Sequence, residues 1–338
     1  MIKRHLFRSL VATALAGFSF SAAASLIPVE IFNGNVGVSI DGIGSNANPV
    51  GTVQAEIPLG STILRAYLYS AGTPIGPNFG GPSTLAAYNS AGITLAGNAI
   101  TNFSALVGAV STRADIDRWA TARADVTTLV QGLAGAGGNF SWSVTEGTLN
   151  TTIDGEVLVI VYSNPALPTG SVALLDGGQN TGGETTTVNL GAPLGDPSAP
   201  GFVATMSIAD SFSCCDQRST ILINGLLLTD NAGNFNDGLQ LTDGSLITVG
   251  GIGDSIANTN SYAGDDELYD LRPFLSTGAT SFSVFTENPT NDDNIFFLAL
   301  QLTGNITDVN GVPEPTSLAL LALGIAMMGT MRRRGRAA

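Results

Sequence analysis

The chain has 338 residues, 13 of them basic and 27 acidic, and a formal net charge of −14 at pH 7. Between its two basic ends lies a long segment with six arginines, 26 acidic residues, no lysine and no histidine. A segment with this excess of acidic residues would repel the phosphates of nucleic acid. We therefore expect no nucleic-acid partner. The missing side chains also exclude Ser-His-Asp and Cys-His catalysis, lysine Schiff bases and histidine zinc sites.

The first 24 residues have the layout of a secretory signal peptide. Lys3, Arg4 and Arg8 form a basic start, and Leu10–Phe20 is an apolar stretch too short to span a bilayer. Small residues follow at Ala22–Ala24. We therefore predict residues 1–24 as a signal peptide cleaved between Ala24 and Ser25. The alternative is a buried or membrane-anchored helix.

The middle of the chain has the pattern of β-strands. Residues 63–69 and 139–146 alternate between apolar and polar side chains, as strands buried on one face do. Residues 157–162 and 295–300 are apolar on both faces, which indicates central strands. Clusters of Gly, Asn, Pro and Asp separate these runs. The pattern predicts an all-β protein, an antiparallel and jelly-roll-like β-sandwich.

Two segments differ from this pattern. Residues 125–131, followed by Gly132, are expected to form one short helix. The Pro- and Gly-rich residues 191–201 are expected to form a long loop.

Several strings of the first half recur in the second half in the same order. They are Ser61–Leu64 with Ser219–Leu222, Asp125–Val130 with Asp270–Leu275, Ser141–Glu146 with Ser281–Glu287, and an apolar strand after Asp154 and after Asp293. The repetition predicts two related β-sandwich modules, residues 25–168 and 169–304. Chance likeness among Ser/Thr-rich strands, or one large sandwich with pseudo-symmetric halves, are the alternatives.

The densest acidic clusters contain Asp265 with Asp266 and Asp292 with Asp293. Carboxylate oxygens on loops suit Ca²⁺, which takes six to eight oxygen ligands. No twelve-residue EF-hand loop is present, and Asp and Asn are also common in solvated turns. These four residues are candidate calcium ligands, with ordinary turns as the alternative.

The only two cysteines are adjacent, Cys214 and Cys215. Their Cα atoms can be only about 3.8 Å apart across a trans peptide, below the usual disulfide range. An exported protein meets oxidising conditions, which favours a vicinal disulfide without a catalytic role. Free thiols or an intermolecular link are the alternatives.

The C-terminal end begins with Val312 and the triplet Pro313, Glu314 and Pro315. An apolar run over residues 318–331 follows, and then four arginines within residues 332–336. The run is shorter than the roughly 20 residues of a spanning helix, and the arginines should stay cytoplasmic. We expect residues 305–311 to be a linker before this tail.

This order of parts resembles the PEP-CTERM sorting signal, which residues 312–338 match. The resemblance implies a surface protein of a Gram-negative bacterium that makes exopolysaccharide and biofilm. It also implies that the membrane enzyme exosortase recognises Pro313, Glu314 and Pro315. The tail would then give transient or lasting anchorage in the inner membrane by a transmembrane helix, before release to the cell surface. An alternative is a chance triplet before an ordinary tail anchor.

The middle of the chain is similar, more loosely, to uncharacterised ectodomains of secreted surface proteins. The similar strings are Ala66–Tyr69, Ala124–Thr127 and Val159–Tyr162. This likeness carries no known activity.

We therefore expect an exported structural or adhesive protein that works with exopolysaccharide and is not an enzyme. One alternative is a carbohydrate-binding module that uses Tyr67, Tyr69, Trp119 and Trp142. Another is a glycosidase that pairs Glu146 with Asp154 or Glu156, since two carboxylates suffice for that chemistry.

Overall fold

The computed structural model describes residues 25–44, 49–72, 75–76, 79–80, 84–110, 118–149, 152–180, 182–213, 218–233, 246–256, 267–289 and 294–313. These residues form a mostly β protein with four antiparallel sheets, which confirms the predicted class. A small ribbon of β5 (Ile75–Gly76) and β6 (Phe79–Gly80) stands apart from the four sheets.

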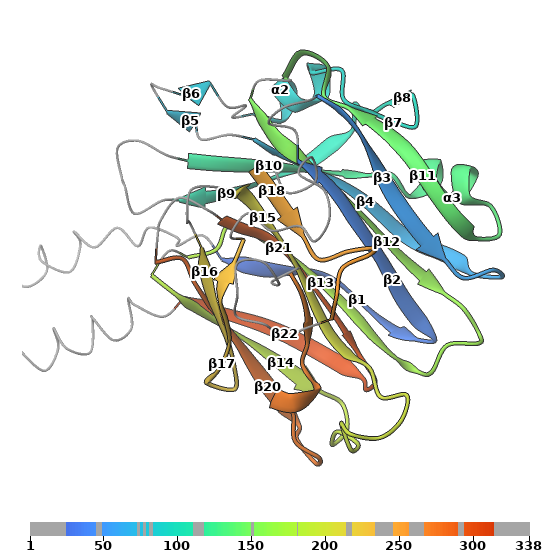
Figure 1. The fold of residues 1–338 in the computed structure, drawn as a ribbon, viewed down its shortest axis with the longest axis vertical. Coiled ribbons are helices and arrows are strands. Elements are labelled where there is room, and N and C mark those ends of the chain that lie inside the picture. The colour runs from blue at the N-terminus through green and yellow to red at the C-terminus, as the bar shows by residue number, and fades with distance from the viewer. Residues whose placement is uncertain are drawn as a thin grey trace, which may run out of the picture.

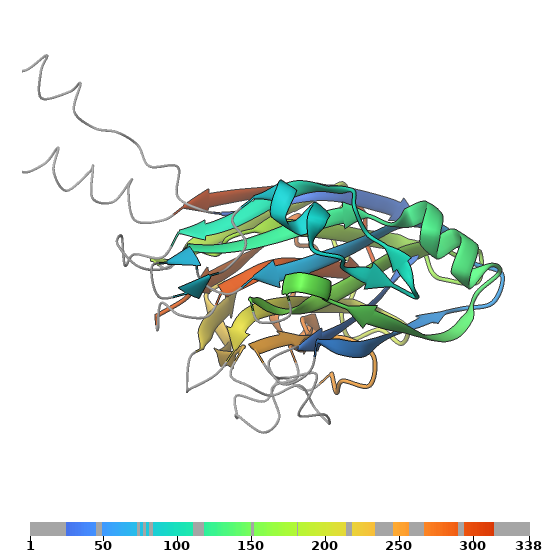
Figure 2. The same ribbon diagram turned by 90° about the horizontal axis from the view of Figure 1, so that it is seen from above.

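The first two sheets form what we call the N-terminal sheet pair. Its inner sheet has the strand order β2 (Val36–Gly44), β12 (Ile153–Ser163), β4 (Thr62–Gly72), β10 (Arg118–Asp125), β9 (Phe103–Val110). Its outer sheet has the order β3 (Val50–Ile57), β11 (Gly138–Thr145), β7 (Thr94–Leu95), β8 (Asn98–Ala99). Helices α2 (Leu85–Ser90) and α3 (Thr127–Ala134) and the 3₁₀-helix η1 (Gly147–Leu149) flank this pair (Figure 1, Figure 2).

The other two sheets form the C-terminal sheet pair. The order of its inner sheet is β1 (Leu26–Gly34), β13 (Gly170–Gly177), β21 (Asn294–Leu302), β15 (Ala204–Ser213), β18 (Leu246–Val249), with β19 (Leu268–Asp270) also on β15. The outer order is β22 (Ile306–Pro313), β14 (Glu184–Leu190), β20 (Ser281–Glu287), β16 (Ser219–Ile223), β17 (Leu226–Ala232). The 3₁₀-helix η2 (Arg272–Phe274) follows β19.

The four sheets stack as four layers with three apolar cores between them. One core fills the N-terminal pair and another fills the C-terminal pair. The third lies between the two inner sheets, where Tyr69 packs against Phe296 and Phe297. Both faces of β12 and β21 are therefore buried, which explains their continuous apolar sequences. The predictions of central strands at 157–162 and 295–300 are confirmed.

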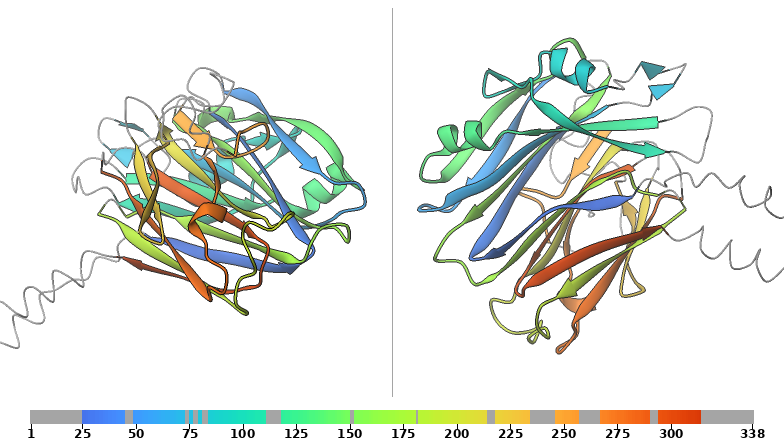
Figure 3. Two further views of the ribbon diagram at one scale, coloured as in Figure 1. Left: turned by 60° about the horizontal axis from the view of Figure 1, so that its bottom comes forward. Right: turned by 180° about the vertical axis from the view of Figure 1, so that it is seen from behind.

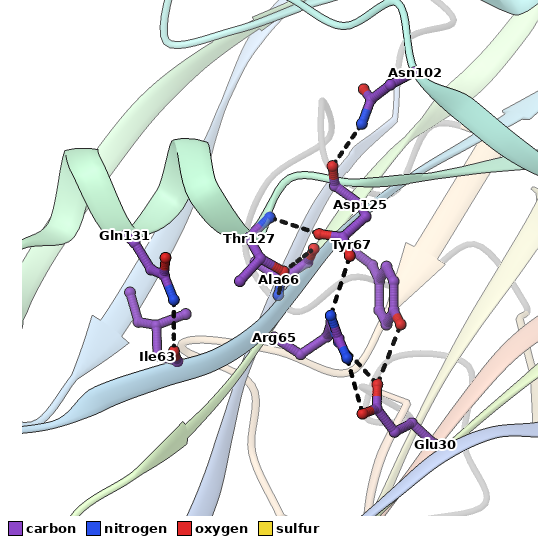
Figure 4. A network of polar contacts seen from close by, with 9 residues as sticks. All are labelled: Glu30, Ile63, Arg65, Ala66, Tyr67, Asn102, Asp125, Thr127 and Gln131. Atoms are coloured by element: carbon purple, nitrogen blue, oxygen red, sulfur yellow. Dashed lines mark hydrogen bonds and ion pairs between the residues drawn. The ribbon is translucent and has the colours of Figure 1, made fainter.

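Two arginines form ion pairs that connect the N-terminal and C-terminal sheet pairs. Arg65 on β4 holds both carboxylate oxygens of Glu30 on β1, at 2.8 and 3.0 Å, and also reaches Asp125 (Figure 4). Arg123 on β10 makes an ion pair with Asp176 on β13, which is 3% exposed at its side chain. Burial raises the pKa of Asp176, and Arg123 acts against that rise. Two of the few arginines of this acidic chain thus form ion pairs at the boundary between the two sheet pairs, which we call the seam.

Eight strands of each sheet pair have the same order along the chain and across the sheets, whereas β1, β9, β18 and β22 have no counterpart. The equivalent strands are β2 and β13, β3 and β14, β4 and β15, β7 and β16, β8 and β17, β10 and β19, β11 and β20, β12 and β21. Three of the four predicted matches follow this equivalence. The fourth, Ser61–Leu64 with Ser219–Leu222, does not, because β4 lies in an inner sheet and β16 in an outer one.

The ends of the chain depart from the expected boundaries. Strand β1 follows the predicted signal peptide yet pairs with β13, in the C-terminal sheet pair (Figure 3). Residues 305–311 were expected to be a linker, but β22 extends from Ile306 to Pro313 and pairs with β14. Ile306 and Val309 are buried in the core of the C-terminal pair, and their burial holds this segment as a strand.

The predicted helix begins and ends later than its sequence suggested. Helix α3 starts at Thr127, whose backbone N–H donates to the Asp125 carboxylate at 2.9 Å. It continues through Gly132 and stops before Gly135, whose φ of 55° a residue with a Cβ adopts less easily. The expected loop at 191–201 is confirmed, since no helix or strand lies between β14 and β15.

Candidate functional site

The first and last described strands meet at one corner of the C-terminal sheet pair, which we call the terminal corner. Its members are Ser25, Leu26, Gly177, Glu184 and Pro313. Glu184 begins β14, and its partner across the ladder to β22 is Pro313. Its Oε1 atom accepts the Leu26 backbone N–H at 3.2 Å. Glu184 thus contacts both the segment that starts at the predicted mature N-terminus and the first residue of the sorting triplet.

The chain is packed tightly at this corner. Leu26 is buried in the core and pairs with Gly177. A Cβ atom at Gly177 would come within 2.0 Å of the Ser25 carbonyl oxygen, and its φ of 148° also favours glycine. The backbone at Ser25 therefore has a defined position against β13.

Glu184 is an acidic group inside this packing. Its side chain is fully buried, and burial raises its pKa to about 7, while the hydrogen bond from the Leu26 N–H and the nearby Ser25 hydroxyl and Asn180 N–H act to lower the pKa. A buried carboxylate is costly unless a cation or several donors compensate it.

Most predicted site residues lie outside the described part of the chain. They are Ala24, Cys214, Cys215, Asp265, Asp266, Asp292, Asp293, Glu314 and Pro315. Of the predicted signal and sorting residues, Ser25 and Pro313 are described, and both lie next to Glu184 at the terminal corner. Among the helices that the structure describes, none has the length and apolar character needed to cross a membrane.

The three carboxylates considered for glycoside hydrolysis lie inside the N-terminal sheet pair. Glu146, Asp154 and Glu156 are each 1% exposed or less. Burial raises the pKa of Glu156 well above its usual range, and the charge of Glu146 raises it further. The Ser70 hydroxyl, which donates to Glu156 at 3.0 Å, opposes this shift. Buried this deeply, the three carboxylates have no open surface on which to meet a polysaccharide.

The strings Ala66–Tyr69, Ala124–Thr127 and Val159–Tyr162 lie in or at the end of three neighbouring strands of one sheet. Strand β4 pairs with β10 on one edge and with β12 on the other. Thr127 Oγ1 accepts the Ala66 N–H at 2.9 Å, which connects two of the strings (Figure 4). Tyr67 and Tyr69 pack into the core between the inner sheets, and Trp142 is buried in the N-terminal pair. These aromatics are therefore structural and offer no platform for a sugar.

A groove of about 400 Å³ lies between the two sheet pairs. One wall comes from β2 and β3 of the N-terminal pair, and the other from β15 and β21 of the C-terminal pair. The turn at residues 250–253 closes it, because the Ile252 N–H donates to the Ile40 carbonyl at 3.2 Å.

Among the described residues that line it, the groove offers hydrogen-bonding groups but no cation. Glu56, Tyr162, Thr205 and Gln301 are among its lining residues, and no Lys, Arg or His is. Burial raises the pKa of Tyr162, and Glu56 raises it further, so the phenol stays protonated at neutral pH. A neutral ligand rich in hydroxyl groups fits this lining better than an anion does.

Comparison with protein-family models, with curated proteins and with solved structures finds no match for this chain.

Sequence reasoning missed Glu184 and the groove. Glu184 stands in a Thr-rich strand whose local pattern is polar, and its contact with Leu26 joins residues 158 positions apart. The groove needs both sheet pairs at once. Only the combination of a predicted cleavage site with a buried acid could have suggested the terminal corner.

Proposed function

We propose that this chain is an exported bacterial surface protein that loses an N-terminal signal and is sorted by exosortase through its C-terminal tail. Its body would then serve a structural or adhesive role in the extracellular polysaccharide of a Gram-negative cell. The supporting observation is that Ser25 and Pro313 both lie beside Glu184, at one corner of the body.

The terminal corner suits a protein that is held in a membrane at both ends during export. A signal before Ser25 and a tail after Pro313 would leave the folded body from the same place. The four-layered body could therefore fold outside the membrane before either end is cut. If Ser25 and Pro313 lay at opposite sides of the body, one of the two membrane-held segments would have to run along the whole body to reach the membrane.

We also propose that the two sheet pairs are copies of one jelly-roll-like sandwich module. Their eight equivalent strands occur in the same chain order. The cores agree in detail, since Trp142 and Val144 on β11 have Phe282 and Val284 as counterparts on β20. A duplicated, rigid body is consistent with a scaffold role.

The test of sorting is Glu314→Ala in the native host, followed by separation of inner membrane, outer membrane and medium. We expect the variant to accumulate in the inner membrane with its tail uncut. Asn310→Ala is the matched control, because this exposed residue of β22 lies just before the triplet. Equal surface amounts of the Glu314 variant and the native protein would refute the proposal.

A second candidate function is the binding of a neutral glycan in the groove. The observation that favours it is the lining of carboxylate, phenol, amide and hydroxyl groups without a cation. Glycan-array binding that Gln301→Ala abolishes would support this function. Gln54→Ala is the control, since Gln54 is exposed on β3 outside the groove. Binding that survives Gln301→Ala would place the ligand elsewhere.

The burial of Glu146, Asp154 and Glu156 supports a non-enzymatic role over the glycosidase alternative. If the Glu146→Gln, Glu156→Gln double variant still hydrolysed the host's polysaccharide, another pair of acids would have to be responsible.

A further inference from the structure

We propose that Glu184 is the binding site for the α-ammonium group that cleavage creates at Ser25. The site is the terminal corner, and its ligand is the protein's own new N-terminus. The inference rests on the proposed function only for the position of the cut, after Ala24.

One of the two carboxylate oxygens of Glu184 already accepts a hydrogen bond from the residue that follows Ser25. Oε1 accepts the Leu26 N–H at 3.2 Å, while Oε2 is buried and has no hydrogen-bond partner among the described residues. The Ser25 hydroxyl is buried nearby and also lacks a partner of good geometry. A strong donor is therefore missing beside Oε2.

The electrostatics of the corner favour a cation there. Burial is the main cause that raises the pKa of Glu184 to about 7, and no described cation lowers it. The nearest charged groups on the surrounding strands do not compensate Glu184. Asp176, next to Gly177 on β13, pairs with Arg123, and Glu287 on β20 does not contribute to the Glu184 shift.

The new N-terminus can supply that cation without moving the strand. Leu26 and the Ser25 carbonyl stay fixed against Gly177, while the Ser25 nitrogen can turn about the residue's own backbone bond. One carboxylate commonly accepts two or three backbone N–H groups. An α-ammonium keeps its charge below a pKa of about 7.7–8.0, so at neutral pH it would form a charge-assisted bond with Glu184.

The consequence is that cleavage tightens the body. Before the cut, Ser25 contributes a neutral amide, and the buried acid weakens the folded state. After the cut, the same acid anchors β1 against β14 and thereby the edge of the C-terminal sheet pair. An exported chain would become more stable on losing its signal.

The test compares three forms of the chain from Ser25 to Ala338 in detergent at pH 7. One has a free Ser25 amine, one has the same amine acetylated, and one begins with Ala23 and Ala24. We expect the free-amine form to unfold several degrees higher than the other two, and Glu184→Gln to remove this difference. Glu287→Gln, on the adjacent strand β20, is the matched control and should preserve it.

The sign of the Glu184→Gln effect provides a sharper readout. It should stabilise the extended form, because it removes a buried charge, and destabilise the free-amine form, because it removes the ammonium's partner. The Ser25 amine should also react with an amine-labelling reagent more slowly in the native protein than in Glu184→Gln. Equal melting temperatures with and without acetylation, or equal labelling rates, would overturn the inference.

These outcomes are separate from those of the proposed function. N-terminal sequencing of the exported protein reports where the cell cuts, whereas the three purified forms report whether Glu184 binds the amine.

Discussion

The N-terminal sheet pair is built from one continuous stretch, β2 to β12, whereas the C-terminal pair combines the stretch β13 to β22 with β1, which comes before the N-terminal pair in the sequence. The eight strands common to both contribute most of the two cores. Two further strands of the C-terminal pair, β1 and β22, cover the same side of it, on β13 and β14, and add Leu26, Ile306 and Val309 to its core. The difference shows that the eight strands common to both pairs provide most of the body, while the segments next to the predicted cleavage sites are attached to one half only.

The pairs also differ in the acids that they bury. The N-terminal pair encloses Glu146 and Glu156, and the position equivalent to Glu146 is Thr286 in the C-terminal pair. The C-terminal pair buries Asp210 and Glu267, and in addition Glu184, on the strand that contacts Leu26 and pairs with Pro313.

The largest expected effect is on the unfolding free energy, and it differs between the two ion pairs at the seam. Arg123→Ala leaves Asp176 buried without its cation and should cost about 3–5 kcal/mol of unfolding free energy. Arg65→Ala should cost less than about 1 kcal/mol, because Arg65 and Glu30 are each about a third exposed. Chemical denaturation measures both. Equal losses would mean that the seam does not depend on the buried pair.

The next effect tests whether β22 belongs to the C-terminal pair. Ile306→Ala should cost about 2–5 kcal/mol, because its side chain is fully buried in that core. Asn310→Ala, at an exposed position of the same strand, should stay within about 0.5 kcal/mol. If Ile306→Ala also proved neutral, residues 305–311 would act as the linker that the sequence suggested.

A smaller effect concerns the buried acids of the N-terminal pair. The folded-state pKa of Glu156 lies above its unfolded value, so its contribution favours folding below about pH 4 and is lost as pH rises toward the folded pKa. Glu156→Gln should therefore stabilise the protein at pH 8, by about 1–3 kcal/mol, and much less at pH 4. Ser70→Ala, which removes only the hydrogen bond, should destabilise at pH 8. A uniform effect of Glu156→Gln across this range would contradict the argument.

The smallest effect concerns calcium, which the acidic clusters of the second half could bind. Millimolar Ca²⁺ should raise the melting temperature slightly more than NaCl of the same ionic strength, because screening alone would make the two salts equal. Asp292→Asn with Asp293→Asn should reduce the calcium-specific part. Equal shifts from both salts would leave Asp265, Asp266, Asp292 and Asp293 as ordinary turns.

The sequence predicted those parts of the fold whose signal is local. Val157–Tyr162 is apolar on both faces because both faces of β12 are buried, and residues 139–146 alternate because β11 has one buried face. The pairing of β1 with β13 has no local signal, since nothing in residues 26–34 indicates a partner more than a hundred positions away. Strand β22 was missed because its core residues, Ile306 and Val309, are separated by polar ones and break strict alternation.

The candidate site was predicted only in part for the same reason. The residues at its two ends, Ser25 and Pro313, follow from the signal and the sorting triplet. Glu184 between them depends on pairings to β22 and to β1 that only the folded chain brings together.

The most direct test of the proposed routing is the intact mass of the protein collected from the cell surface. A protein that both signals process begins at Ser25 and has lost the arginines of residues 332–336. A surface form that retains residues 1–24, or that ends with the intact arginine cluster, would contradict it.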